Sequence, residues 1–567
     1  MEQLAAFLHD FPSLCLFLSI LLGTIIGRFH VKGVGFGSVV GTLIAGIFIG
    51  IFAKPELPDM LRWAFFYLFL FAIGYSVGPQ FFGSLKKDAV PQIVLTMVVA
   101  ISGLITVVVV SAIFHFDEGL AVGLLSGAMT QSAALGSGLS AISELPISDA
   151  AKTILIANAP LADAITYGFG DLGLILFLTW LGPKMMRANL KSEAKALEQK
   201  LSGGKDSGPF FTAARLGRRA YRLEKADAAV NLAALEARFA ADRLSVQRVQ
   251  RDGELLTAEP TLALKPGDLL LVSAHRAALL RAEREIGPEI DDPVFLSVPV
   301  QTVSVVVTRG EVSGSTLGTL AQDPRARGLY LESIQRGTVQ VPREPWTVLQ
   351  RGDILRIIGA PEDVERGAEY IGFVERDLAR TDLMFLAGGI SAGMLLGVLK
   401  FSAGGIAIGL GTAGSILVVG LVAGWARSRY PVFGAIPEPA QRLLMDIGLT
   451  VFIAVIGMTA GPHAVEAYRV SGGAFFASIF VAGMIVTMVP LAMGTIVARY
   501  MLKMSPLMTL GSLAGAQTCT PGLNALREAS GSNVGSLAYT VPYAINNIVL
   551  TLWGPVVVLI VHFMRTP

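Results

Sequence analysis

Two short polar stretches inside apolar sequence are the part of this chain that could do chemistry. Residues 127–132 read Gly-Ala-Met-Thr-Gln-Ser, and residues 515–520 read Gly-Ala-Gln-Thr-Cys-Thr. Where Gly and Pro break a helix, the freed N–H groups and the positive end of the half-helix dipole can receive a carboxylate. We therefore predict a substrate-binding site, with Pro521 and Gly522 breaking the second helix. Its predicted members from these stretches are Thr130, Gln131, Ser132, Gln517, Thr518, Cys519, Thr520 and Asn524.

The competing interpretation of these stretches is that their small residues only let helices pack closely. For one stretch alone that interpretation would be preferred. Two matching stretches, both with Gly-rich breaks, favour the substrate site.

Carboxylates within an apolar segment are a second chemical signal. Asp163 and Asp171 lie in the stretch 162–171, and Asp171 is about four turns inside the basic boundary at Arg187. A carboxylate there costs about 2.5–3.5 kcal/mol on insertion scales, so Asp171 should face a cavity or a partner. Asp171 could hold a substrate ammonium group or carry a proton. Two alternatives have equal weight: Asp171 could pair with a structural Arg, or it could lie closer to the membrane surface than this placement assumes. The matching region of the second half has polar side chains at Tyr539, Tyr543, Asn546 and Asn547, of which Asn546 is a predicted site residue.

Other chemical groups give weaker signals. Arg442 and Asp446 are spaced i, i+4 on a predicted helix, which favours a helical ion pair, although Arg442 could reach a substrate carboxylate and is kept as a candidate site residue. The His residues fall singly and the two Cys residues lie about 500 residues apart, so we predict no metal site and no disulfide. No nucleophile–base pair can be named, so we predict neither an enzyme nor a cofactor.

The elements that must position these residues occur twice. A Gly-x-x-x-Gly-Pro motif stands at 74–79 and again at 457–462, and Leu-Thr-Trp-Leu-Gly-Pro at 178–183 resembles Leu-Thr-Leu-Trp-Gly-Pro at 550–555. With the polar stretches, three paired motifs follow the same order in each half. Duplicated membrane halves with broken apolar segments are typical of secondary transporters. Pro in a helix removes a hydrogen bond, so further helix breaks are predicted at Gly78, Pro79, Gly461 and Pro462.

Composition places the two halves in lipid and the middle of the chain in water. The 567 residues are 53% hydrophobic, with a mean hydropathy of +0.61, which excludes an ordinary soluble protein. Residues 188–380 hold 27 of the 45 Lys and Arg and 27 of the 43 Asp and Glu. The net charge of +2 and the absence of a basic stripe give no sign of nucleic-acid binding. Residues 12–29 are predicted to be a first membrane span rather than a cleaved signal.

About 20 apolar residues cross a bilayer, which predicts five spans in each half. Basic residues follow every second boundary, so those ends should face the cytoplasm and the N-terminus should lie outside. Because five is odd, the second half should be inverted relative to the first. Residues 119–160 and 507–530 are left as re-entrant or broken segments. The predicted spans are 12–29, 35–53, 63–83, 91–114, 165–186, 383–399, 403–425, 443–462, 473–497 and 537–563.

The charged insert is itself repeated. A Gly-Asp turn followed by an apolar strand pattern occurs at 265–272 and again at 350–357. The expected fold is thus a multi-span α-helical membrane protein of two inverted-topology repeats, with an inserted pair of small α+β cytoplasmic domains. The predicted boundaries are 1–187 for the first membrane repeat, 188–208 for a linker, 209–290 and 291–380 for the two small domains, and 381–567 for the second repeat.

Over essentially its whole length the chain resembles the aspartate:alanine exchanger family of bacterial transporters. The resemblance rests on the two halves with Gly-x-x-x-Gly-Pro and on the two modules with Gly-Asp strand turns. The insert is similar to a tandem pair of TrkA-C (RCK C-terminal) domains. The resemblance implies an electrogenic antiporter of the bacterial inner membrane that takes up L-aspartate, expels L-alanine and contributes to the proton-motive force. It also implies a homodimer in membrane lipid, with small amino acids or dicarboxylates as partners and a possible regulatory ligand on the TrkA-C-like domains.

Three alternatives stay open at this point. The first is a dicarboxylate (succinate) or glutamate exporter of the same family, because no motif separates these substrates. The second is an ion or proton transporter or channel regulated by its TrkA-C-like domains, although no Thr-Val-Gly-Tyr-Gly-like selectivity filter occurs. The third is a membrane sensor, which is disfavoured because no signalling module is recognisable.

Overall fold

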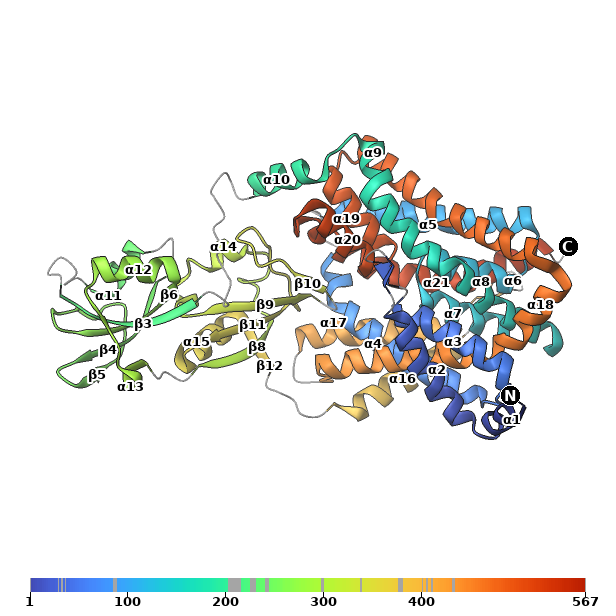
Figure 1. Ribbon diagram of the computed structural model, residues 1–567, viewed down its shortest axis with the longest axis horizontal. Helices are drawn as coiled ribbons and strands as arrows, with labels where there is room; N and C mark the ends of the chain where they lie inside the picture. Colours follow the sequence, from blue (N-terminus) through green and yellow to red (C-terminus); the bar gives the residue numbers. More distant parts are fainter. Residues whose placement is uncertain are drawn as a thin grey trace. The chain divides into compact units, whose positions relative to one another are not determined.

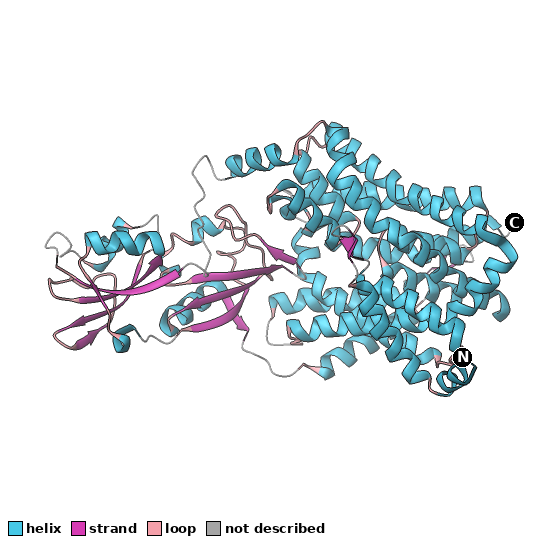
Figure 2. Cartoon of the chain, viewed as in Figure 1, coloured by secondary structure: helices cyan, strands magenta, loops and turns pink. Residues whose placement is uncertain are grey.

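The computed structural model divides into two compact units. One unit comprises Met1–Glu198 and Leu378–Pro567, and the other comprises Gln199–Asp377 (Figure 1). The structure describes residues 2–28, 30–31, 34–35, 37–84, 89–201, 216–224, 231–239, 244–296, 300–336, 339–375, 381–399, 401–403, 406–408, 411–430 and 434–565. The first unit is almost entirely helical, and the strands lie mostly in the second (Figure 2).

The first unit is built from apolar helices. In chain order they are α1 (Glu2–Asp10), α2 (Pro12–Gly27), α3 (Gly37–Ala53), α4 (Asp59–Ser84), α5 (Val90–Phe114), α6 (Glu118–Ala128), α7 (Ser132–Ser143), α8 (Asp149–Leu176), the π-turn η2 (Phe177–Leu181), α9 (Gly182–Met186), α16 (Leu383–Val398), α17 (Gly411–Arg429), α18 (Glu438–Ile496), the π-turn η7 (Val497–Met501), α19 (Pro506–Ala516), α20 (Thr520–Ser530), the 3₁₀ turn η8 (Val534–Ala538) and α21 (Thr540–Arg565). The helix α10 (Leu190–Leu201) leads into the second unit.

Six of the described helical segments are long and apolar enough to cross a membrane, or seven if the bent pair α1 and α2 is one span. The prediction of a multi-span helical membrane protein is therefore confirmed. The six segments are Asp59–Pro79, Val90–Phe114, Asp149–Met186, Glu438–Val470, Gly472–Met501 and Thr540–Arg565. They coincide with six of the ten predicted spans.

Several predicted span boundaries need correction. The fifth span begins at Asp149, not at residue 165, so the end of the first broken segment was placed too late. Residues 401–403 and 406–408 form the two-stranded hairpin β13–β14, although residues from 403 onward were predicted as membrane helix. A similar hairpin, β1–β2, joins His30–Val31 to Val34–Gly35 before α3. Short β hairpins thus precede the second helix of each half.

The Gly-Pro motifs are packing sites and not helix breaks, which corrects that prediction. Helix α4 continues through Gly78 and Pro79, and α18 continues through Gly461 and Pro462. A Cβ added at Gly78 would lie 2.2 Å from the carbonyl oxygen of Leu421 in α17, and one at Gly461 would lie 2.4 Å from that of Ile47 in α3. Glycine is needed here because the helix backbones touch. The break in α18 lies instead at Gly472, with φ +69°.

Glycine contacts also fix the direction of the short helices. Gly119, Gly123 and Gly127 of α6 lie against the carbonyl oxygens of residues 155, 159 and 163 in α8, a constant offset that makes the two helices parallel. Gly138 of α7 instead packs on Val122 of α6. Gly138 lies eight residues after the break at residue 130, and Val122 lies eight residues before it. Helix α7 therefore turns back along α6. The second half repeats the parallel contact, because residues 511 and 515 lie against the carbonyls of residues 535 and 539.

The second unit contains two five-stranded antiparallel sheets with the same strand order. The first sheet is β5-β4-β6-β3-β7 and the second is β10-β9-β11-β8-β12. The strands are β3 (Leu216–Arg222), β4 (Ser245–Arg251), β5 (Glu254–Leu256), β6 (Leu269–His275), β7 (Glu289–Ile290), β8 (Gln301–Val307), β9 (Tyr330–Arg336), β10 (Val339–Val341), β11 (Ile354–Gly359) and β12 (Gly372–Glu375). The helices α11 (Leu232–Arg238), α12 (Arg276–Glu285) and α13 (Pro293–Leu296) belong to the first sheet's module. The helices α14 (Leu317–Leu320) and α15 (Pro361–Ile371), with the 3₁₀ turn η6 (Pro324–Ala326), belong to the second's.

The repeated Gly-Asp pair has a structural role in both modules. Gly267 and Gly352 have φ values of +94° and +88°, which only glycine adopts without strain. The following carboxylates, Asp268 and Asp353, are buried and each accepts two hydrogen bonds from an Arg, Arg251 and Arg336 respectively. Burial alone would raise the pKa of Asp268, but Arg251 and the N–H of Lys265 stabilise the carboxylate and hold its pKa below the usual range.

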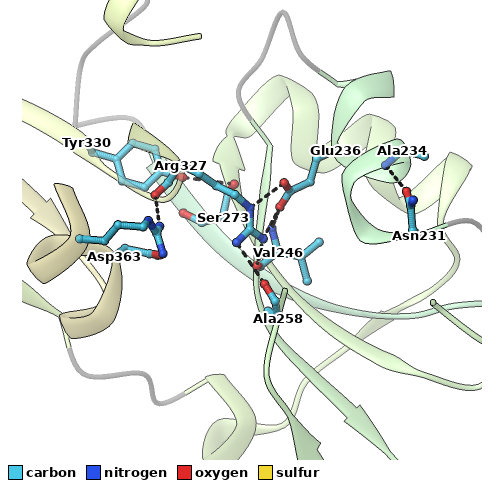
Figure 3. A network of polar contacts seen from close by, with 10 residues as sticks. Asn231, Ala234, Glu236, Val246, Ala258, Ser273, Arg327, Tyr330 and Asp363 are labelled. Carbon is cyan, nitrogen blue, oxygen red and sulfur yellow. Dashed lines mark hydrogen bonds and ion pairs between the residues drawn. The ribbon is translucent and has the colours of Figure 1, made fainter. Parts of the chain in front are cut away.

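A polar network joins the two modules (Figure 3). The Arg327 guanidinium donates two 2.8 Å hydrogen bonds to the Glu236 carboxylate of α11, and others to the carbonyls of Ala258 and Val246. Tyr330 donates to the carbonyl of Ser273. Such a planar, two-pronged contact fixes orientation as well as distance. The two modules are thus held together by specific contacts.

Candidate substrate site at two helix breaks

Two helix breaks with the same backbone form the centre of the candidate site. Helix α6 ends at Ala128 and α7 begins at Ser132, while α19 ends at Ala516 and α20 begins at Thr520. Thr130 and Thr518 have left-handed φ values of +52° and +51°. In each break, the backbone N–H of the residue after the Thr donates a hydrogen bond to the carbonyl five residues earlier. The distance is 2.8 Å in the first break and 3.1 Å in the second. A β-branched residue in this conformation is strained, so the surrounding contacts must hold it in place.

The two breaks hold each other. The Thr130 hydroxyl donates to the carbonyl oxygen of Gln517 at 2.5 Å, and the Thr518 hydroxyl donates to the carbonyl oxygen of Thr130 at 3.3 Å. Thr130 and Gln517 are buried. The reciprocal hydrogen bonds bring together residues 387 and 388 positions apart in the sequence. The structure therefore places the two predicted polar stretches at one point.

The N-cap residue of the second helix of each break contacts the opposite half. Gln131 donates through Nε2 to Asn547 Oδ1 of α21 at 3.2 Å. Cys519 donates through Sγ to Asp171 Oδ1 of α8 at 3.1 Å. Asn546 donates to the carbonyl of Ala516, the last residue of α19. Asp171 and Asn546 thus join the break residues, as predicted from the sequence.

The second break is open and the first is closed. Thr520, Asn524 and Glu528 are exposed and share one face of α20 at i, i+4 spacing, whereas Ser132 to Ser140 of α7 are buried. Thr520 also exchanges a hydrogen bond with the Tyr539 hydroxyl at 3.2 Å. The second break therefore has a polar, exposed helix face next to it, and the first break does not. Pro521 and Gly522 lie in the first turn of α20, just after its N-cap Cys519, so the break lies before them, at Thr518.

Arg442 is not brought to the site. It lies in the first two turns of α18, its side chain is 53% exposed, and it pairs with Glu438 four residues earlier. The predicted pairing with Asp446 is therefore corrected to Glu438. Among the described residues, no group of three or more His, Cys, Asp or Glu side chains could hold a metal ion.

Sequence reasoning missed three groups that the structure adds. Tyr167 lies one turn from both Asp163 and Asp171, and the i, i+4, i+8 spacing of these residues could have revealed the stripe. Asn547 was noticed but not assigned, although it accepts from Gln131. Thr487 of α18 donates to the carbonyl of Ala128 at the end of α6, and nothing in the sequence marks it.

Comparison with known proteins gives the family. The model of the Asp-Al_Ex family, described as a predicted permease membrane region, matches residues 15–183 and 385–559. An uncharacterized transporter of Bordetella bronchiseptica is 48% identical over 98% of each chain. Uncharacterized transporters of Shewanella oneidensis (34% identical, 99% of this chain and 100% of the relative) and Bradyrhizobium diazoefficiens (36%, 90% and 99%) are also similar. No solved structure matches the chain. The two matched ranges hold both helix breaks and the helices around them, and the chain belongs to the aspartate–alanine exchanger (Asp-Al_Ex) family as a multi-pass membrane transporter rather than an enzyme.

Proposed function

We propose that this transporter exchanges external L-aspartate for internal L-alanine at the paired helix breaks. The observation that carries the proposal is the meeting of two half-helix N-termini, those of α7 and α20, beside the partly buried carboxylate of Asp171. Helix N-termini carry N–H groups without intrahelical acceptors and a partial positive charge. Aspartate has two carboxylates and one ammonium group, which matches two N-termini and one acid.

The α-carboxylate and the α-ammonium group are common to both substrates. We assign the ammonium group to Asp171, and the α-carboxylate to the N-terminus of α20, because Cys519 links the two within 3.1 Å. The aspartate side-chain carboxylate would then meet the first turn of α7 at Gln131 and Ser132. Alanine leaves that place empty. This assignment replaces Arg442, which the fold keeps at an exposed ion pair.

The net charge moved in each exchange follows from the charges of the two substrates. Aspartate is a net monoanion at neutral pH and alanine is net neutral, so one-for-one exchange moves negative charge inward. The exchange is therefore electrogenic and contributes to a proton-motive force. A runner-up function, the export of succinate or glutamate, uses the same two N-termini. Glutamate has the same charged groups as aspartate, whereas succinate, which has no ammonium group, is favoured only if Asp171 does not need to bind one.

The wider architecture is also proposed. Three paired features support two inverted repeats. They are the two helix breaks, the hairpins β1–β2 and β13–β14, and the glycine contacts of α4 with α17 and of α18 with α3. The two five-stranded modules suit tandem TrkA-C-like domains on the cytoplasmic side of a bacterial inner membrane, where they could bind a regulatory ligand. We further propose a homodimer. The boundaries predicted from the sequence remain predictions, and residues 202–208 of the predicted linker lie outside the described residues.

Exchange in proteoliposomes tests the function. Vesicles are loaded with unlabelled aspartate, alanine, succinate or buffer, and labelled aspartate is added outside. We expect uptake only with aspartate or alanine inside, and we expect an imposed inside-positive potential to accelerate aspartate–alanine exchange. Asp149→Asn is the matched control for the variant Asp171→Asn in this assay, because the Asp149 carboxylate lies at the start of the same helix α8 and its side chain is fully exposed. Uptake that needs internal succinate, or that ignores the internal solute, would rule the proposal out in favour of a dicarboxylate or ion pathway.

A further inference from the structure

Asp163 is a buried acid for which the exchange mechanism has no use. It lies on α8 two turns before Asp171, its residue exposure is 0%, and neither carboxylate oxygen has a hydrogen-bond partner of ordinary geometry. The hydroxyl of Ser126 lies beside the Asp163 carboxylate and donates to the carbonyl of Gln131 at 3.1 Å. Eight residues of helix separate Asp163 from Asp171 by about 12 Å along the axis, so the two acids cannot bind one ammonium group.

No cation of the protein compensates Asp163 within the described residues around it. Of the elements packed on α8, α3, α7 and the part of α18 after Gly472 carry no charged side chain. Helix α6 carries only Glu118, at its far end, where it contacts His562 and Arg565. Helix α20 meets α8 at Leu174 and Leu178, well beyond Asp163. Among the described titratable groups, Tyr167 interacts electrostatically with Asp163, and a tyrosine hydroxyl is not cationic.

The last turn of α6 packs on α8 from Asp163 to Gly170, and it carries no positive charge. The carbonyls of Gly127 and Ala128, at the negative end of α6, lie against α8 at Gly170. At the second break, which contacts α8 at Asp171 rather than at Asp163, the side-chain amide of Gln517 and the Oδ1 atom of Asn546 are fully buried and have no hydrogen-bond partner among the described residues. Ends of broken helices and unwound carbonyls are the groups that hold coupling cations in other transporters. An ionised acid without a partner costs several kcal/mol or more in such a place, whereas a neutralised one costs much less.

We propose that Asp163 binds a monovalent cation, a proton or Na⁺, which neutralises it during the transport cycle. The inference rests on the proposed function for its role in the cycle, but the binding itself does not depend on the substrate. The cation would couple the packing of α6 and α8 to the state of the breaks, because Asp163 lies under the last turn of α6, which leads directly into Thr130. The site is separate from the proposed ammonium site at Asp171.

Thermal unfolding of the purified full chain tests the binding without any amino acid present. The apparent Tm is measured from pH 6 to pH 9 in choline chloride and in NaCl at equal ionic strength, for the wild type, Asp163→Asn and the control Asp149→Asn. For a proton, the wild-type and control Tm should fall by about 2–4 °C more than that of Asp163→Asn over this range in either salt. For Na⁺, NaCl should restore the Tm at pH 9 in the wild type and the control but not in Asp163→Asn.

Coincident curves for Asp163→Asn and the wild type in both salts would overturn the proposal. If Asp163→Asn does not fold, infrared difference spectra of the wild type replace it. A carboxylic-acid band that disappears with rising pH, or a carboxylate band that shifts on adding Na⁺, supports the site, and the absence of both overturns it. Because these assays contain no substrate, their failure leaves aspartate–alanine exchange standing, and failed exchange leaves the cation site standing.

Discussion

The two helix breaks share a backbone but not a chemical environment. Thr130 and Thr518 take the same left-handed conformation, and each donates its hydroxyl to a carbonyl of the other break. At the first break the N-cap residue Gln131 has a neutral, buried partner in Asn547. Around the second, Cys519 contacts a carboxylate and the next turn of helix is exposed.

The comparison separates what the fold needs from what binding needs. Backbone features that recur in both breaks, such as the left-handed Thr and the glycine contacts before it, build the scaffold. Features present in only one break, above all Asp171 and the exposed face of α20, are the ones that the proposed substrate site requires. A symmetric scaffold with asymmetric side chains can bind an asymmetric substrate such as an amino acid.

The largest effect is expected from removing the charge that distinguishes the breaks. Asp171→Asn gives the second break an amide partner like that of the first and leaves the substrate ammonium group without a counter-charge. We expect aspartate exchange to fall by about 100-fold or more, since each tenfold corresponds to about 1.36 kcal/mol. Initial rates of labelled aspartate uptake into alanine-loaded proteoliposomes measure it.

Asn547→Ala is the matched change at the first break. It removes the partner of Gln131 but no charge, so exchange should fall by less than about tenfold, in line with the loss of one neutral hydrogen bond. Equal losses in the two variants would mean that the breaks do not differ in function, and that Asp171 is structural.

Sequence alone located the breaks because Gly, Pro, Ser and Thr interrupt apolar sequence twice in matching order. It also singled out Asp171 and Asn546, which the structure places in contact with the second break, since polar groups at membrane depth are rare. It failed at the Gly-Pro motifs, where a kink was predicted. Pro near the end of a long helix removes one hydrogen bond, whereas the close approach of α17 and α3 depends on a neighbouring helix that no local pattern reveals.

The error at Arg442 has a similar cause. A cation at i, i+4 from an acid has two possible partners on a helix, and the sequence could not tell Asp446 from Glu438. The contacts of Thr487 and Asn547 with the breaks were also out of reach, because they join residues more than 350 positions apart. Local chemistry was therefore predictable, while contacts between the halves were not.

A smaller effect is expected from filling the glycine contacts that the breaks share. A Cβ at Gly515 would lie 2.2 Å from the carbonyl oxygen of Tyr539, and one at Gly127 would lie 2.6 Å from that of Asp163. Gly515→Ala and Gly127→Ala should each lower the free energy of unfolding by about 1–3 kcal/mol, the usual cost of overpacking. Gly168→Ala on α8 is the control, because its Cβ would meet no atom within 4 Å. Thermal unfolding of the purified chain measures all three; an unaffected Gly127→Ala would show that only the second scaffold contact is tight.

The smallest effect should separate the two threonine hydroxyls. Thr130→Val and Thr518→Val keep the branched shape at the left-handed position, so each removes only one donor. Thr130 donates at 2.5 Å from a buried position, while Thr518 donates at 3.3 Å and is half-buried. We expect Thr130→Val to lower the free energy of unfolding by about 1–2 kcal/mol and Thr518→Val by about half as much, within the usual range for one hydrogen bond. The double variant should cost less than the sum, because loosening either break also weakens the hydrogen bond made by the other. The unfolding midpoints of the wild type, the two single variants and the double variant measure this. If the losses of the two single variants add strictly in the double variant, the breaks do not hold each other.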